Sequence, residues 1–176
     1  MINKDWTGNT QSVMATLGSS SHSNKDRPET DYYATPELAV RELLKLEKFS
    51  SAIWECACGE LHITKILEES GYTVRSSDII DRVGNEVCDF LDSKQWDSDI
   101  ITNPPFAKAT EFLEHALNIL PNGSKIAFFL RIQFLEGVKR RAIFNENPPI
   151  RIWVSSRNLR WQSSIFNYGI YRRTNC

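Results

Sequence analysis

Short apolar segments alternate with segments of helical spacing along most of this chain, and this alternation constrains its fold more than any single residue does. A strand, a helix and another strand in succession are typical of a parallel sheet with helices on both faces. The run Ile126 to Leu130 is apolar at every position, which is typical of a strand buried on both faces. Strands are expected at residues 52–56, 72–75, 86–88, 99–102, 125–132 and 150–154, with a seventh at 166–171.

Helix signals lie between these strands. Thr35 and Pro36 are typical of a helix start, with Thr35 as the N-cap and Pro36 in the first turn, and apolar spacing continues to residue 48. Gly71 ends a second helix. Further helices are expected at residues 109–120 and 136–145. The sequence therefore predicts a mostly parallel central sheet covered on both faces, with a short C-terminus because the last two strands must follow the last helix.

The composition divides the chain into an arm and one domain. Residues 1–31 are rich in Ser, Asn, Thr and Gly and are expected to form a flexible arm, while residues 32–176 suffice for one domain with a core. No apolar stretch approaches the roughly 18 residues that a membrane-spanning helix needs, and a signal peptide is not evident. The four cysteines lack zinc-ligand spacing. We therefore expect a cytoplasmic protein with reduced thiols, no metal site and no membrane partner.

Positive charge is concentrated towards the C-terminus. The net charge is −1, but residues 125–176 hold 10 Lys or Arg against 2 Glu, so residues 1–124 hold the other 11 basic and 20 acidic side chains. The segment 150–176 adds aromatic residues to this charge. Such asymmetry favours a surface that faces a polyanion, and a solvated basic face is the alternative.

The tetrapeptide Asn103-Pro104-Pro105-Phe106 directly follows the strand expected at 99–102. Two prolines stop the strand and hold its end stiff, because each fixes φ near −65°. The Asn side chain carries one acceptor and two donors, and the Phe ring offers a flat apolar face. Such a strand end suits a planar ring that bears an exocyclic amine, although, taken alone, the motif is more often a simple turn that ends a buried strand.

Acidic side chains end the neighbouring strands. Glu55 precedes the Gly59 turn, Asp78 ends the second strand and Asp89 ends the third. A carboxylate at the end of the second strand is placed to accept from ribose hydroxyls, and Asp89 is placed to accept from an adenine amine. Because ligands of such folds bind at the carboxyl ends of the strands, these side chains are expected to lie along one groove.

Taken in order, these motifs resemble those of class I S-adenosylmethionine-dependent methyltransferases, and in particular the gamma group of adenine-N6 DNA methyltransferases. The matching segments are Tyr33-Ala34-Thr35-Pro36-Glu37, Glu55-Cys56-Ala57-Cys58-Gly59, Asp78, Asp89-Phe90 and Asn103-Pro104-Pro105-Phe106. The likeness covers about residues 32–135. It implies a Rossmann-like class I methyltransferase fold, S-adenosyl-L-methionine as the cofactor and DNA as the partner.

The resemblance also implies a role for each site residue. Asn103, Pro104, Pro105 and Phe106 would be catalytic, with the amide and the Pro104 carbonyl accepting the two amine protons while Phe106 stacks on the base. The cofactor would contact Tyr33, Thr35, Pro36, Glu55, Ala57, Cys58, Gly59, Asp78, Ile79, Asp89, Phe90 and Asn103. The basic tail would contact DNA phosphates through Arg157, Arg160, Trp161, Arg172 and Arg173.

Two departures from the group leave alternatives open. Leu61 stands where a second glycine is usual, at a position that calls for positive φ or close approach to the cofactor. Too few residues follow the last helix for the group's target-recognition domain. The acceptor could instead be an RNA base or a protein glutamine amide, since both present a planar NH₂. A third alternative is an inactive protein that binds only cofactor or nucleic acid.

Overall fold

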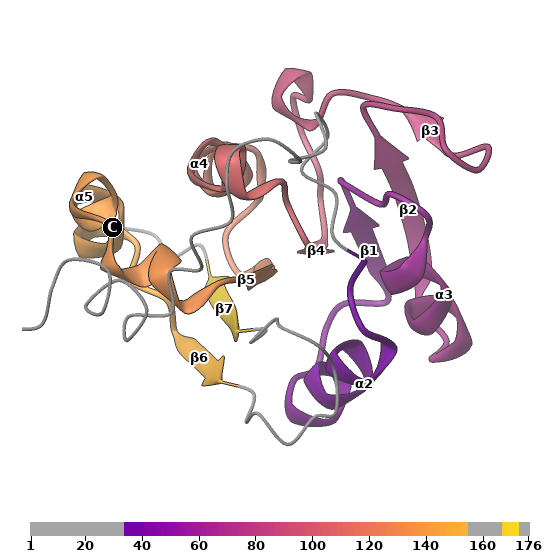
Figure 1. The fold of residues 1–176 in the computed structure, drawn as a ribbon, viewed down its shortest axis with the longest axis horizontal. Coiled ribbons are helices and arrows are strands. Elements are labelled where there is room, and N and C mark those ends of the chain that lie inside the picture. Colours follow the sequence, from indigo (N-terminus) through magenta and orange to yellow (C-terminus); the bar gives the residue numbers. More distant parts are fainter. Residues whose placement is uncertain (1–33, 155–166, 173–176) are drawn as a thin grey trace, which may run out of the picture. The chain divides into compact units, whose positions relative to one another are not determined.

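The computed structural model describes residues 34–154 and 167–172 (Figure 1). The helices are α2 (Glu37–Leu46), α3 (His62–Glu69), α4 (Ala109–Ile119) and α5 (Arg141–Glu146). The 3-10 turns are η1 (Phe90–Asp92), η2 (Phe106–Lys108), η3 (Ile132–Glu136) and η4 (Val138–Arg140). The strands are β1 (Ala52–Glu55), β2 (Thr73–Asp78), β3 (Glu86–Val87), β4 (Asp99–Thr102), β5 (Lys125–Leu130), β6 (Arg151–Val154) and β7 (Asn167–Arg172).

Within the described residues, seven strands form one sheet in the order β3-β2-β1-β4-β5-β7-β6. β1 pairs in parallel with β2 and β4, β2 pairs in parallel with β3, and β4 does so with β5. β7 lies between β5 and β6 and is antiparallel to both (Figure 1). The predicted mostly parallel sheet is confirmed, and the seventh strand expected at 166–171 is present as β7.

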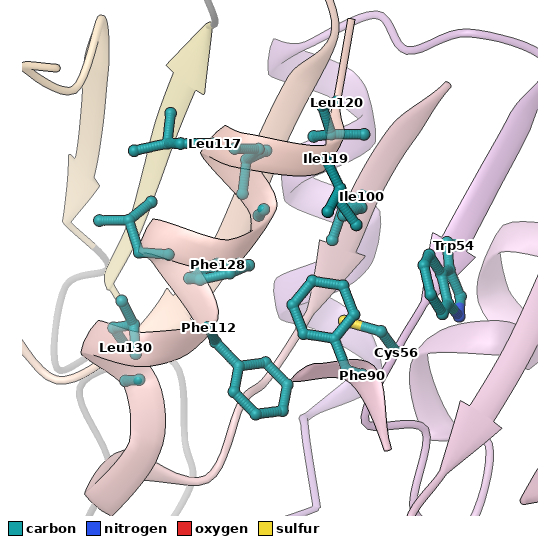
Figure 2. Packing of buried hydrophobic residues seen from close by; sticks show 14 of the residues in the cluster. Trp54, Cys56, Phe90, Ile100, Phe112, Leu117, Ile119, Leu120, Phe128 and Leu130 are labelled. Atoms are coloured by element: carbon teal, nitrogen blue, oxygen red, sulfur yellow. The ribbon is translucent and has the colours of Figure 1, made fainter. Parts of the chain in front are cut away.

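Two clusters of buried side chains lie on opposite faces of this sheet. Along β5, Ile126, Phe128 and Leu130 belong to the first cluster, whereas Ala127 and Phe129 belong to the second. Because successive strand residues point to opposite faces, β5 is buried on both sides, as predicted. Helix α4 supplies the first cluster, shown in Figure 2, while α2 and α3 supply the second. Helices therefore cover both faces of the sheet.

The start of α2 differs from its prediction. The helix begins at Glu37, and the N-cap is Pro36 in an extended conformation (φ −61°, ψ 133°). Thr35 lies one residue before the cap, and its hydroxyl oxygen accepts a hydrogen bond from Nδ2 of Asn103. The prediction that Thr35 caps the helix was wrong, because this hydroxyl bonds to the end of β4 instead.

The helix predicted over 136–145 was also wrong in extent. The chain forms η3 and η4 before α5 begins at Arg141. Gly137 interrupts any helix because its backbone is extended (φ −73°, ψ 121°). The Arg140 side chain packs against this turn, donating from Nε to the Phe134 carbonyl at 2.5 Å. A Cβ at Gly137 would lie 2.3 Å from Nη2 of Arg140 and would displace that guanidinium.

The residue after α2, Glu47, connects that helix to the far part of the sheet. Its carboxylate is almost fully buried, and it pairs with Arg151 of β6 at 2.5 Å and with Lys125 of β5 at 3.6 Å. A buried carboxylate requires such partners, since a lone buried charge is strongly unfavourable. Two of the basic residues counted towards the C-terminus therefore have structural roles.

In the part of the chain that the structure describes, no helix has the length and apolar character needed to cross a membrane.

Candidate cofactor and acceptor site

Asp78 joins two turns at the carboxyl ends of β1 and β2. Its Oδ2 accepts from the backbone N–H of Gly59 at 2.9 Å, and its Oδ1 accepts from the backbone N–H of Ile80 at 3.1 Å. Gly59 adopts positive φ (52°), which a glycine tolerates at little cost. The backbone of Cys58 also donates to the Ser77 carbonyl at 3.0 Å. These bonds fix the Asp78 carboxylate, which is partly exposed, at the edge where the predicted groove begins.

Leu61 occupies a left-handed backbone conformation (φ 65°, ψ 29°) directly before α3. Among the described residues it is the one non-glycine residue with positive φ. Its N–H donates to the Cys58 carbonyl at 2.8 Å, and its carbonyl accepts from Lys65, so the conformation is tied to the turn and to the helix start. An L-residue pays about 1–2 kcal/mol for this conformation. The expectation that this position calls for a glycine is confirmed for the backbone.

Glu55 at the end of β1 is turned towards α3. Its Oε2 accepts from the backbone N–H of Thr64 at 2.7 Å and also from the Thr64 hydroxyl, which lies 2.6 Å from Oγ of Ser76. Burial raises the pKa of Glu55 to about 8; the bonds from Thr64 act in the opposite direction, and the nearby Asp78 charge adds to the rise. The geometry therefore shows Glu55 holding the first turn of α3 against β1, and its contact with a cofactor stays a prediction.

Asp89 and Phe90 follow β3 and have different surroundings. Oδ1 of Asp89 accepts from the backbone N–H of Leu91 at 2.9 Å, so Asp89 caps η1. The Phe90 ring is 1% exposed and packs edge-on to Trp54 at 5.2 Å and against Phe112 at 4.9 Å (Figure 2). The ring thus belongs to the core, and the backbone of Phe90 remains as the part that could contact a cofactor.

The Asn103 amide follows β4 and is fixed by a residue from the start of the domain. Its Nδ2 donates to Oγ1 of Thr35 at 3.1 Å across 68 residues of sequence. Thr35 is buried, so the bond is shielded from water. Because the NH₂ group faces Thr35, the oxygen Oδ1 points the other way, and this oxygen is buried. Two of the predicted motifs are therefore in direct contact.

Phe106 begins η2 after the extended Pro105 (φ −57°, ψ 126°). Its ring is half-buried and packs against the first core cluster. The guanidinium of Arg131 lies over this ring, with Cζ 4.6 Å from the ring centroid. Sequence reasoning missed Arg131, although its position as the first residue after β5 places it at the same edge as Asn103.

The remaining predicted residues lie near this edge or outside the described part. Ala57 is half-buried, Pro104 is buried and Ile79 is 58% exposed. Burial raises the pKa of Cys58 to about 12, helped by the Glu55 and Asp78 charges, so the thiol stays protonated.

Arg172 ends β7, and its backbone alone is described. Outside the described residues lie the arm 1–31 and the candidates Tyr33, Arg157, Arg160, Trp161 and Arg173.

No protein-family model and no curated protein matches this chain. Solved structures do match it in fold. A Listeria monocytogenes protein assigned to the class I S-adenosylmethionine-dependent methyltransferases aligns with a TM-score of 0.64 and 14% identity, covering 86% of this chain and 64% of that protein. A Pyrococcus horikoshii protein assigned as an RNA methyltransferase aligns with a TM-score of 0.58 and 15% identity, covering 92% and 96% of the two chains.

A third structure, the N-methyltransferase NodS from Bradyrhizobium japonicum, aligns with a TM-score of 0.57 and 13% identity over 79% of this chain and 94% of that one. Identities this low establish the fold alone. The chain therefore has the Rossmann-like fold of the class I S-adenosylmethionine-dependent methyltransferases, and it spans about two-thirds of the length of the Listeria protein.

Proposed function

We propose that this chain is an S-adenosylmethionine-dependent methyltransferase that acts on the N6 amine of adenine in DNA. The observation that carries the proposal is the Asn103 amide, which Thr35 fixes at the carboxyl end of β4. An oriented amide oxygen followed by the partly exposed ring of Phe106 suits a planar acceptor with an exocyclic NH₂. The class I methyltransferase fold supports the same function.

The edge formed by β1, β2 and β3 fits the nucleoside part of S-adenosylmethionine. Asp78 uses one lone pair of each oxygen for Gly59 and Ile80, and a carboxylate offers about four lone pairs, so acceptors remain for ribose hydroxyls. Asp89 is partly exposed and would accept from the adenine amine. The bound cofactor supplies a methyl group on a positively charged sulfur, which is a good leaving group.

Asn103, Pro104 and Phe106 would prepare the acceptor. The lone pair of an exocyclic adenine amine is delocalised into the ring, which makes the amine a weak nucleophile. Oδ1 of Asn103 and the Pro104 carbonyl would accept hydrogen bonds from the two N–H groups of the amine and aim its lone pair out of the ring plane. Phe106 would stack on the base, which in a duplex must first be flipped out at a cost of a few kcal/mol. These residues accelerate transfer by positioning and electrostatics.

Acceptor profiling tests this assignment. Purified protein with isotope-labelled S-adenosylmethionine would be given DNA, RNA and a glutamine-containing protein in parallel. We expect label in DNA and little in the other two acceptors. Label confined to RNA or to protein would contradict the choice of acceptor while leaving the methyltransferase assignment intact.

An RNA base is a second candidate acceptor. The Pyrococcus horikoshii structure assigned as an RNA methyltransferase covers nearly the whole of both chains, which favours this candidate. An RNA base presents the same planar NH₂ to Asn103 and Phe106. The parallel assay of DNA and RNA decides between these two acceptors, which differ chemically by the 2′-hydroxyl of RNA.

The left-handed Leu61 makes a binding protein without activity a further alternative. Calorimetry with S-adenosylmethionine separates it from the first proposal. We expect saturable cofactor binding, and no binding at high micromolar cofactor would favour the inactive alternative.

A further inference from the structure

Arg131 lies over the ring on which the acceptor base would stack. Its Cζ is 4.6 Å from the centroid of Phe106, within the range of a cation–π contact. The two residues come from different strands: Phe106 follows β4, and Arg131 is the first residue after β5. β4 and β5 are parallel neighbours, so both residues lie at the carboxyl edge of the sheet.

This contact competes with base stacking. Planar rings stack face to face at van der Waals contact, so a base cannot enter between Arg131 and Phe106 while the guanidinium stays in place. Arg131 is exposed and lies on a flexible side chain, which lets the guanidinium move without disturbing the core. Base binding is therefore coupled to movement of this positive charge.

Other basic residues of this region have structural contacts: Lys125 and Arg151 pair with the buried Glu47, and Arg140 donates to backbone carbonyls of η3. The guanidinium of Arg131 lies over Phe106, beside the proposed acceptor position. A guanidinium is suited to phosphate because its planar fork matches the oxygens of that group.

We propose that Arg131 is an acceptor-binding residue specific for nucleic acid. Without acceptor its guanidinium covers Phe106; when the base stacks on Phe106, the guanidinium swings out and binds the phosphate next to that base. The proposal rests on the proposed function, since it takes Phe106 as the stacking ring. A glutamine amide brings no such phosphate, so this residue favours a nucleotide over a protein acceptor.

The test compares wild type with three variants on a single-stranded adenine-containing DNA oligonucleotide. Arg131→Ala removes the charge, and Arg131→Lys keeps it without the planar fork. Lys45→Ala is the charge-matched control. Lys45 is exposed and pairs with Glu42 near the end of α2. Glu47, which follows this helix, pairs with Lys125 at the start of β5, so Lys45 lies near the edge of the sheet opposite to the candidate site. Methyl transfer is measured across several salt concentrations, and oligonucleotide binding is measured by fluorescence anisotropy under the same conditions.

We expect Arg131→Ala to raise KM for the oligonucleotide by up to about tenfold, the value of one charge-assisted hydrogen bond reduced by the relieved competition for Phe106, with kcat within about twofold of wild type. The dependence of log KM on log salt should become shallower by about one unit, as for one lost phosphate contact. Arg131→Lys should retain the salt dependence, and Lys45→Ala should match wild type.

An Arg131→Ala protein with wild-type KM, anisotropy and salt dependence would overturn the inference. A fall in kcat alone would also overturn it, because that result assigns Arg131 to the chemical step. If Lys45→Ala changed KM and anisotropy as much as Arg131→Ala does, binding would depend on net charge and the inference would fail. The proposed function fails separately: if wild type transfers no methyl group, yet Arg131→Ala weakens oligonucleotide binding with the predicted salt signature, the phosphate role stands without the activity.

Discussion

Thr35 and Asn103 form the contact on which the candidate site depends most. An amide can present either its oxygen or its nitrogen on a given side, and the hydrogen bond to Thr35 fixes which side each atom takes, with the oxygen buried. The Thr35 hydroxyl is buried, so water competes little for this bond. Thr35, a residue outside the Asn-Pro-Pro-Phe segment, therefore orients the first side chain of that segment.

Thr35→Val removes the hydroxyl while keeping the side-chain shape. We expect kcat to fall about tenfold, since one hydrogen bond of about 1 kcal/mol or more no longer orients the amide. Thr35→Ser keeps the acceptor and should recover most of the activity. Steady-state kinetics of methyl transfer measures both, and equal activity of the Val and Ser variants would rule out this role for the hydroxyl.

Leu61→Gly addresses the left-handed turn before α3. Glycine relieves about 1–2 kcal/mol of backbone strain but loses a similar amount through the entropy of the unfolded chain and lost packing. We therefore expect a small change in the free energy of unfolding and tighter S-adenosylmethionine binding, because the side chain no longer limits approach to the turn.

Leu61→Val is the matched control for this prediction. A β-branched residue is strained at positive φ, so we expect a loss of about 1–3 kcal/mol in the free energy of unfolding. Denaturant titration measures the free energy of unfolding of both variants, and calorimetry measures their affinity for S-adenosylmethionine. A Val variant as stable as wild type would show that residue 61 does not hold the left-handed conformation.

Between elements, Glu55 is the link that orients α3 against β1. The side chain leaves the end of β1 and accepts two hydrogen bonds from Thr64 in the first turn of the helix. The helix start next to the Gly59 turn is thereby set by a buried acid. Burial raises the pKa of that acid to about 8, so near neutral pH the carboxyl group is largely protonated.

A pH-dependent stability follows from this raised pKa. The folded state binds the Glu55 proton more tightly than the unfolded state does. The resulting contribution to the free energy of unfolding is fully present below about pH 4.5 and is lost as the pH rises through about 8. Glu55→Gln keeps an acceptor for Thr64 and removes the titration. We expect wild type to lose roughly 1–4 kcal/mol relative to this variant between those pH values.

Denaturant unfolding across this pH range measures the effect. Glu114→Gln, at an exposed position of α4, controls for the removal of a carboxylate that does not act on Glu55. Parallel stability curves for wild type and Glu55→Gln would contradict the buried, protonated state of Glu55.

Elements with local signals could be predicted, and elements that depend on distant partners could not. The unbroken apolar run of β5 identified a strand buried on both faces, because alternate residues of the strand pack into the clusters on its two sides. The helix over 136–145 was mispredicted because Gly137 is extended and Arg140 bonds back to η3. The Thr35 hydroxyl was assigned to a cap because the sequence does not show that Asn103 lies beside it.

Over the whole molecule, the sheet order brings the separate motifs to one edge. β1, β2, β3, β4 and β5 run parallel, so the residues after their carboxyl ends share that edge. This grouping was predictable from alternation alone. The place of β7 between β5 and β6, and the position of Arg131 over Phe106, required the tertiary structure because both join segments that are distant in sequence.

The central claim is that Asn103 presents an adenine amine of DNA for methylation. The most direct measurement is mass spectrometry of nucleosides from DNA incubated with S-adenosylmethionine and either wild type or Asn103→Ala, after circular dichroism and cofactor calorimetry show that both are folded and competent to bind. We predict N6-methyladenine with wild type and none above background with Asn103→Ala. Equal amounts of N6-methyladenine from the two proteins, or none from wild type on any DNA, would contradict the account.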